Sequence, residues 1–530
     1  MSELTQTPAS AMSPFAPDTA QSRGLLLGLA LATGMEFYTF DSVNLVLADM
    51  TGTLGLSADE ASWLLTVYSS ALFLGVPISI WLAGHFGYKR YLIATTLLFA
   101  VTSMGCAVSS NLSALLIWRG IQGFAGAGLV MWWRASVYLL MPKAQRSPSL
   151  MRISTVLYLS SAAGLLVSGY LTDHFNWRLI FLPNLLFAGA AVWLLLRHFP
   201  KVPPPTSTRL IKTDWIGIVL LASALICLQI ALNRGQIDDW FGALFIRTLA
   251  FICIVALVAF IFWQHSPRNV APLLDLALLR NRYVMSSILI GLLTGMILSG
   301  SLFVLPEFLR NVSTHTYSAT QTGQIICIYA LTAAAVRPLI VPLIARLGQR
   351  KTIALALSML IASMLLLHQL LTTSTPAGNY VLPLILFGLC LSPLLPAVGS
   401  GTVARIEPEK LLDGVSLYMT FRQFGASLGV ALLNVLLAHR ESLHSGRLFE
   451  HLQTNNSEAR SWLGTVQAHA NTHGYSPFES HHVALVQLIE AAKHQAETLS
   501  YADAFAFMAV IGVLALCLIP IIPPTPVIQK

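Results

Sequence analysis

Long apolar runs alternate with short polar segments along most of this 530-residue chain. Each run has about 20 residues, the length that an α-helix needs to cross the hydrocarbon core of a bilayer. The runs predict fourteen transmembrane helices, at residues 24–48, 61–83, 91–109, 112–141, 151–171, 177–196, 215–232, 242–263, 283–305, 320–343, 352–371, 380–403, 415–438 and 501–522. The pattern therefore predicts an all-α, polytopic membrane protein.

The composition agrees with this prediction. Hydrophobic residues make up 55% of the chain and charged residues 10%, whereas about 25% charged residues is typical of a soluble domain. The net charge of +8 does not indicate nucleic-acid binding, because the basic residues lie in short loops between apolar runs, where they set topology. We expect membrane lipid around the chain and no nucleic acid as a partner.

The loops on one side of the alternation carry most of the basic residues, including Lys89, Arg90, Arg350 and Lys351. Because positive loops stay in the cytoplasm, we expect both termini there. Residues 1–23 are rich in Ser, Thr, Pro and Ala and predict a disordered cytoplasmic N-terminus. They lack the basic start and apolar core of a cleavable signal.

A faint internal repeat predicts the domain organisation. Gly87-Tyr-Lys-Arg90, after the second span, is similar to Gly348-Gln-Arg-Lys351, after the tenth, so spans one to six match spans nine to fourteen. We expect an N-terminal six-helix bundle at 24–200, a cytoplasmic linker with three prolines at 201–214, two inserted helices at 215–264 and a C-terminal six-helix bundle at 265–530. That last unit contains a long polar loop at 439–500, in which 481–497 has the apolar spacing of an amphipathic helix.

The fourth span contains two polar residues, Arg119 and Gln122, which share one face of a helix. A charge at this depth has to face a protein interior or a watered cavity. One interpretation is a structural arginine that donates to backbone carbonyls. The other is a polar centre that a transported ion or substrate passes.

The first span contains two acids, Glu36 and Asp41. They are separated by about 140° around a helix, so they face different neighbours. Asp41 and Arg119 each lie about 10 Å from the outer end of their span, which predicts an ion pair that breaks when Asp41 takes a proton. Glu36 lies deeper, where it would hold a cation or a proton. The alternative is that each acid stays protonated and bonded to backbone.

Aromatic and sulfur-containing side chains lie near these polar groups. Phe37, Tyr38, Gln122, Met131 and Trp132 are expected to line an accommodating cavity for amphipathic ligands. Packing against neighbouring helices is the alternative use of these side chains.

Four stretches carry a family resemblance, namely Trp81–Arg90, Arg119–Gly126, Gly169–Phe181 and Phe421–Gly429. Together they resemble the major facilitator superfamily, and specifically its fourteen-helix drug/proton antiporter branch. The resemblance implies two six-helix bundles plus two inserted helices. It also implies proton-coupled efflux of drug-like or amphipathic molecules by alternating access.

The family motifs transfer to particular residues. The gating-loop motif falls on Gly84, His85, Gly87, Lys89 and Arg90, and helix packing is expected at Gly123, Gly126, Gly164, Gly169, Arg422, Gly425 and Gly429. The loop motif normally has an aspartate where this chain has Gly84, and the second copy has Ala345. The latch between helix ends is therefore expected to use backbone carbonyls with His85, Lys89 and Arg90.

No enzyme is expected, because the chain shows neither a nucleophile beside a base nor a phosphate-binding loop, and we expect no cofactor or metal. In the family, fourteen-helix members from bacteria with two membranes often work with a periplasmic adaptor and an outer-membrane channel. We therefore expect an inner-membrane location and look for adaptor contact at His439–Ser500. A dedicated siderophore or metabolite exporter and a non-transporting membrane sensor remain alternatives.

Overall fold

The computed structural model describes residues 20–200, 214–235, 238–269, 272–273, 276–313, 316–403, 406, 410–451 and 457–522. The ordered elements within these ranges are helices, without a strand. Residues 1–19 of the predicted N-terminal segment and 201–213 of the predicted linker lie outside the described residues.

Six long helices form the first half of the chain: α1 (Ala20–Leu54), α2 (Ala58–Phe86), α3 (Tyr88–Val108), α4 (Leu112–Leu140), α5 (Lys143–His174) and α6 (Pro183–His198). Polar residues outside the spans start them: Ser57 and Glu60 form a capping box at α2, and Asn111 caps α4. α1 packs against α5 and α6, and α4 packs against α2 and α3.

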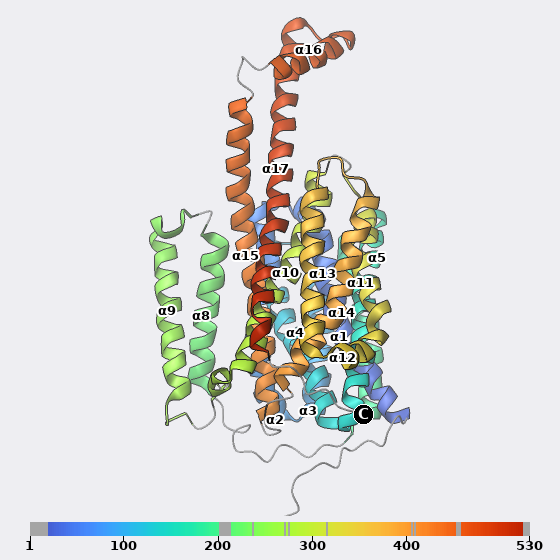
Figure 1. Cartoon of the computed structure of the whole chain (residues 1–530), viewed down its shortest axis with the longest axis vertical. Coiled ribbons are helices and arrows are strands. Elements are labelled where there is room, and N and C mark those ends of the chain that lie inside the picture. The colour runs from blue at the N-terminus through green and yellow to red at the C-terminus, as the bar shows by residue number, and fades with distance from the viewer. Residues whose placement is uncertain are drawn as a thin grey trace, which may run out of the picture.

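The second half repeats this arrangement with α10 (Arg282–Glu307), α11 (Ala319–Val336), α12 (Ile340–Leu347), α13 (Gln349–Leu370), α14 (Val381–Val403), α15 (Leu411–His451) and α17 (Pro477–Cys517). α10 packs against α15 and α17, and α14 packs against α11 and α13. Short turns of helix lie at η1 (Trp177–Phe181), η2 (Trp240–Gly242), η3 (Leu276–Arg280), η4 (Phe308–Val312), η5 (Arg337–Leu339), η6 (Ala377–Tyr380) and η8 (Ile519–Ile521). The long helices run side by side as a bundle (Figure 1).

The prediction of an all-α polytopic membrane protein is confirmed. Among the described residues, 13 helices are long and apolar enough to cross a membrane. α1 is not one of these 13, but it packs inside the same bundle and carries Glu36 and Asp41 in its middle. Each of the fourteen predicted spans thus falls on a helix.

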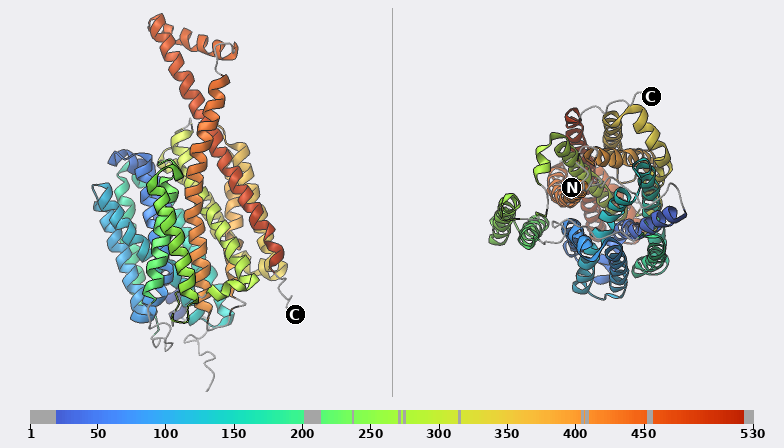
Figure 2. Two further views of the ribbon diagram at one scale, coloured as in Figure 1. Left: turned by 90° about the vertical axis from the view of Figure 1, so that its left-hand side faces the viewer. Right: turned by 90° about the horizontal axis from the view of Figure 1, so that it is seen from below.

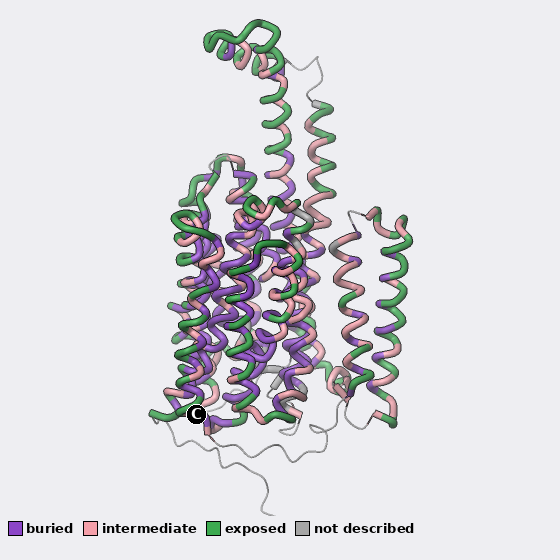
Figure 3. The backbone as a smooth tube through the Cα atoms, turned by 180° about the vertical axis from the view of Figure 1, so that it is seen from behind, coloured by how far each residue is buried: buried purple, intermediate pink, exposed green. Residues whose placement is uncertain are grey.

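Two helices stand beside the main bundle, α8 (Trp215–Arg234) and α9 (Leu244–His265) (Figures 1 and 2). α8 contacts α2 and α15, whereas the long-helix neighbour of α9 is α8. One face of α9 is buried, whereas large apolar side chains on its other faces, such as Phe251 and Phe262, are exposed. Exposed positions are green along the tube in Figure 3. Such a surface suits a bilayer rather than water.

One carboxylate holds the start of this helix pair in place. Asp214 caps α8 and accepts hydrogen bonds from the indole N–H of Trp263 and the amide of Gln264, both at 2.6 Å, and from Asn269 at 2.9 Å. Burial raises the pKa of Asp214, but these hydrogen bonds outweigh it, so the pKa is lowered below its ordinary value. The charged form therefore ties α8 to the end of α9.

Two helices extend beyond the spans predicted for them. α15 and α17 have 41 residues each, and α16 (Ser457–Thr472) connects them at the far end. Together they form a hairpin that projects past the other helices (Figures 1 and 2). At its base, Asp503 on α17 lies 2.9 Å from His444 and 3.5 Å from Arg440, both on α15. The helix predicted at 481–497 is confirmed, as part of the longer α17.

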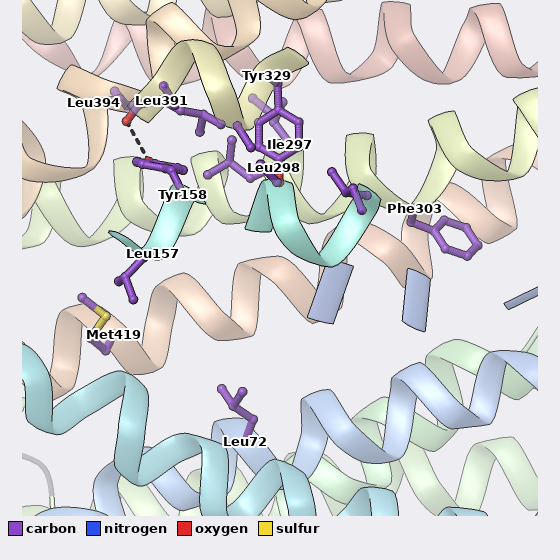
Figure 4. Close-up of a cluster of buried hydrophobic side chains, with 14 of the residues drawn as sticks. Leu72, Leu157, Tyr158, Ile297, Leu298, Phe303, Tyr329, Leu391, Leu394 and Met419 are labelled. Carbon is purple, nitrogen blue, oxygen red and sulfur yellow. Dashed lines mark hydrogen bonds between the residues drawn. The ribbon is translucent and has the colours of Figure 1, made fainter. Parts of the chain in front are cut away.

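The core is close-packed between the halves as well as within them. In Figure 4, apolar side chains of α5, α11 and α14 interlock near Tyr158 and Tyr329. The Tyr158 hydroxyl donates to the carbonyl of Leu391 at 3.4 Å, which links α5 to α14. Segments far apart in the sequence therefore share one interior.

We predict that Asp214→Ala loosens the inserted pair, since several buried donors lose one shared acceptor, at a cost of about 1–3 kcal/mol. Because its folded pKa is lowered, the wild-type contribution is present at neutral pH and is lost as pH falls through that pKa. Hydrogen exchange of α8 and α9 in detergent measures this loss. Ser223→Ala is the matched control, because within the part of the chain that the structure describes its exposed hydroxyl bonds only to Val219 of the same helix. Equal exchange in both variants would contradict the prediction.

Candidate functional site

Arg119 lies fully buried between α4 and α2. It donates to the side chain of Gln122 at 2.8 Å and to the carbonyl of Leu64 on α2 at 3.4 Å. Its guanidinium also lies 4.0 Å from the ring centre of Tyr68, a cation–π contact. Arg119 therefore makes backbone contacts, as one interpretation expected, but only as part of a larger cluster.

A chain of hydrogen bonds continues from Gln122 across the bundle. Its amide donates to Ser103 on α3 at 2.8 Å, and Asn184 on α6 donates to the same Ser103 hydroxyl at 3.0 Å. Asn184 also donates to Thr39 on α1 at 2.8 Å. This buried network joins α1, α2, α3, α4 and α6 through polar side chains.

Glu36 belongs to the same region. Its carboxyl oxygen accepts from the hydroxyl of Tyr68 at 3.4 Å, and the Tyr68 ring in turn lies against Arg119. Tyr68 thus connects the deeper acid of α1 to the arginine of α4. The positive charges of Arg422 and Arg119 and the negative charge of Asp41 all act on this acid.

Asp41 lies in a different place, at the contact between the two halves of the chain. It accepts hydrogen bonds from Ser161 on α5 and from the hydroxyl of Tyr329 on α11, the latter at 3.0 Å. Ser161 and Tyr329 also bond to each other at 2.8 Å. The predicted ion pair between Asp41 and Arg119 is wrong, because the two side chains face different helices and have different partners among the described residues.

Glycines allow the helices around Asp41 to approach closely. A Cβ on Gly164 would overlap the carbonyl of Tyr38, and one on Gly169 the carbonyl of Ala319 on α11. Other predicted packing positions lie at similar backbone contacts: Gly123 at Tyr68, Gly425 at Leu292, Gly429 at Met296, and the carbonyl of Arg422 at Gly295. Gly126 lies instead against side chains, nearest the hydroxyl of Tyr68. Small residues serve this purpose at membrane helix interfaces.

A small cavity of about 20 Å³ lies between the halves. Its lining comes from α1, α2, α4, α8, α10 and α15, and includes Phe40, Asn44, Leu65, Thr66, Tyr68, Ser69, Arg119, Gln229, Ser299, Gln423, Ala426, Ser427 and Val430. Arg119 is one of these lining residues, and one of its terminal nitrogens is buried without a hydrogen-bond partner among the described residues.

The residues predicted to line a cavity lie elsewhere. Trp132 donates to the carbonyl of Ser79 at 3.2 Å and packs on Tyr88, Tyr38 packs on Phe187, and Met131 is fully buried. Phe37 packs against the core, and Gln122 belongs to the hydrogen-bond network. Polar residues inside the second and thirteenth spans, such as Thr66, Ser69, Gln423 and Ser427, line the small cavity instead. A polar residue within an apolar span is the sequence feature that could have identified them.

The gating-loop motif forms the joint between α2 and α3. Gly87 has φ +86°, which a side chain would disfavour, and Gly348 has φ +76° at the matching joint of α12 and α13. Lys89 donates to the carbonyls of Leu196 at 2.7 Å and Phe199 at 3.4 Å, at the end of α6. In the same motif Gly84 is buried, His85 stacks on Trp81, and Arg90 is exposed.

Two further contacts join the halves at the ends of α1 and α5. Asp49 and Arg310 form an ion pair at 2.7 Å. Asp173 accepts from the backbone N–H groups of Ala319 at 3.1 Å and Thr320 at 2.7 Å, at the start of α11. Sequence reasoning missed both contacts, because their partners are far apart in the chain.

We predict that Ser103→Ala destabilises the protein by about 1–3 kcal/mol, since the buried amides of Gln122 and Asn184 then lose their shared acceptor. Thermal unfolding in detergent measures the loss. Thr102→Ala is the matched control, because among the described residues its hydroxyl bonds only to carbonyls of its own helix. If both variants unfold at the wild-type temperature, the network does not stabilise the bundle.

Comparison with known proteins gives the same family as the motifs. The model of the Major Facilitator Superfamily matches residues 29–430. Multidrug export protein EmrB of Escherichia coli (strain K12) is 26% identical over 443 residues, which cover 84% of this chain and 85% of that protein. Colistin resistance protein EmrB of Acinetobacter baumannii is 27% identical over 462 residues, which cover 86% of this chain and 88% of that protein. Fatty acid resistance protein FarB of Neisseria gonorrhoeae is 25% identical over 456 residues, which cover 85% of this chain and 87% of that protein.

Solved structures share the fold. A POT family transporter in complex with a thioalcohol-conjugated peptide has a TM-score of 0.63 at 12% identity, over 94% of this chain and 96% of that one. The xylose transporter XylE from E. coli, in a partially occluded inward-open conformation, has a TM-score of 0.57 at 13% identity, over 96% of this chain and 99% of that one. The drug-efflux branch expected from the motifs is confirmed by the relatives named above. The chain thus belongs to the Major Facilitator Superfamily and is a membrane transporter rather than an enzyme.

Proposed function

We propose that this protein exports drug-like or amphipathic small molecules across the bacterial inner membrane in exchange for protons. The observation that carries the proposal is the position of Asp41, a buried acid whose partners Ser161 and Tyr329 belong to different halves of the chain. A charged Asp41 accepts both hydrogen bonds and holds α1, α5 and α11 together. A protonated Asp41 is a weaker acceptor, so the contact loosens and the halves separate more easily.

The moving parts are two six-helix bundles, residues 24–200 and 265–530, with the inserted pair at 215–264. Three matching pairs of contacts support this division: α1–α5 with α10–α15, α1–α6 with α10–α17, and α3–α4 with α13–α14. The similar backbone conformation of Gly87 and Gly348, both with positive φ, supports the same repeat. Rocking of one bundle against the other would expose the cavity to alternate sides.

The proposed orientation has both termini in the cytoplasm and the hairpin of α15 and α17 in the periplasm. The basic loop residues support this orientation by the positive-inside rule. The contacts Asp49–Arg310 and Asp173–Thr320 then lie at the outer face and close it. Lys89 lies at the inner face, where it latches the loop to the end of α6.

Glu36 is proposed as a second proton- or cation-binding group. Tyr68 connects it to Arg119, so a change of charge at Glu36 alters the field at the arginine that lines the cavity. Arg119 would then hold or release an acceptor group of the cargo as the proton state changes. The mixed lining of the cavity suits amphipathic molecules, as do the names of the relatives, which include multidrug export and fatty acid resistance.

We predict that Asp41→Asn abolishes cargo-driven proton release from proteoliposomes, since asparagine cannot take up a proton, and that Glu36→Gln weakens it. The cargo is chosen by a susceptibility panel on a deletion strain. Asp239→Asn is the control, since this acid is exposed in the loop after α8. Full proton-coupled transport by both Asp41→Asn and Glu36→Gln would remove these acids from the mechanism.

The hairpin is proposed as the docking site of a periplasmic adaptor that leads to an outer-membrane channel. Its helices extend past the rest of the bundle, and exposed apolar side chains lie near its tip, such as Trp462 and Phe478. A transporter on its own has no evident need for such a projection. An adaptor would use it to align its own passage with the outer face.

Replacing residues 446–475 by a short linker is expected to remove adaptor capture in a pull-down from cross-linked membranes. Resistance of intact cells should fall to that of the deletion strain, whereas transport in proteoliposomes should persist, because the cavity and Asp41 are untouched. Full resistance of cells that carry the shortened protein would contradict adaptor docking at the hairpin.

A further inference from the structure

The inserted helix α8 is attached to both halves, but at different heights. Near its start, Trp215 packs edge-on against Trp81 of α2, with ring centres 5.4 Å apart. Fourteen residues later, about 21 Å along the axis, Gln229 accepts a hydrogen bond from Ser427 of α15. One end of α8 is thus held by the first half and the other end by the second.

A groove opens where the start of α2 meets the end of α8, the turn after it and the start of α9. It lies at the opposite end of α8 from the tryptophan contact. Its volume is about 680 Å³, and its lining consists of Trp63, Ile230, Arg234, Asp238, Ala243 and Phe245. Most of this lining is apolar. The exception is the ion pair of Arg234 and Asp238, at 3.1 Å. The groove is therefore amphipathic, with an apolar wall and a charged rim.

The groove and the small cavity between the halves are neighbours along the same two helices. Trp63 and Ile230 line the groove, while Leu65 and Thr66 of α2 and Gln229 of α8 line the cavity. A molecule that leaves the cavity between α2 and α8 would therefore enter the groove directly. In the proposed orientation the groove lies at the level of the outer leaflet.

We propose that this groove is a lateral binding site for amphipathic cargo, which passes through it between the cavity and the outer leaflet. The proposal rests on the export function proposed above and adds a route to it. Cargo fits better than a resident phospholipid, because the groove lies next to a cavity lined by Arg119 along α2 and α8, and because its own arginine is already paired with Asp238.

The two attachments of α8 explain how the route opens. The Gln229–Ser427 hydrogen bond carries the outer end of α8 with α15, while the Trp81–Trp215 contact keeps the inner end beside α2. When the halves separate on the outer side, α8 tilts with the second half. The seam between α2 and α8 then widens at the groove and stays closed at the inner end.

Pairwise distances between spin labels test this motion. The labels are placed on Thr53→Cys of the first half, His439→Cys of α15 and Leu244→Cys of the inserted pair, in a protein whose six native cysteines are replaced by alanine. On a change between acidic and alkaline buffer, the 53–439 and 53–244 distances should shift together, while the 244–439 distance stays constant. If the 53–244 distance stays constant while the 244–439 distance changes, the inserted helices move with the first half, and the proposal is overturned. A constant 53–439 distance overturns alternating access itself.

Protection of a groove cysteine tests the ligand, with rhodamine 6G as the amphipathic probe. At about ten times its Kd the dye should slow maleimide labelling of Ala243→Cys about tenfold by mass action. It should leave Leu244→Cys unchanged, since the adjacent Leu244 is exposed outside the groove. Equal protection of both cysteines, no protection, or complete protection by phospholipid before dye is added each overturns the proposal.

Discussion

The structure depends on one constraint: hydrocarbon offers no water to an ionisable side chain, so the protein itself has to supply its polar partners. Asp41 shows the consequence, because its partners Ser161 and Tyr329 come from two other helices. A helix bundle that needs this acid buried therefore needs α1, α5 and α11 to meet. Any change in the charge of Asp41 acts on the contact between the halves, which is where a transporter has to move.

The two acids of α1 contact different parts of the protein. Glu36 faces Tyr68 and Arg119 inside the first bundle, whereas Asp41 faces the second bundle. Gly164 and Gly323 bring the backbones of α1, α5 and α11 close together. Asp41, Ser161 and Tyr329 can therefore reach one another. In the proposed mechanism, the hydrogen bonds of Gln122, Ser103 and Asn184 keep the first bundle together as a unit, and the motion takes place between the bundles.

The sequence was sufficient for the spans, because the bilayer sets both their length and their polarity. It was also sufficient to predict that Glu36 and Asp41 diverge, since helix geometry fixes the angle between them. It was insufficient for the partner of Asp41, because equal depth says nothing about which way two helices are turned. Met131 and Trp132 are likewise predicted to line a cavity but lie in packed interior, because the sequence does not show which face of their helix is turned toward a cavity. Because hydropathy falls around Ser500, the sequence predicts two separate helices, at 481–497 and 501–522, where α17 is continuous. The backbone has no proline there to end the helix.

The central claim is that Asp41 changes its proton state during the transport cycle. Infrared difference spectroscopy of the purified protein, with and without cargo, detects the carbonyl stretch of a protonated carboxyl group, and Asp41→Asn assigns it. If Asp41 changes its proton state, a band appears or disappears on cargo binding in the wild type and is absent from the Asp41→Asn difference spectrum. An identical difference spectrum from both proteins would contradict it.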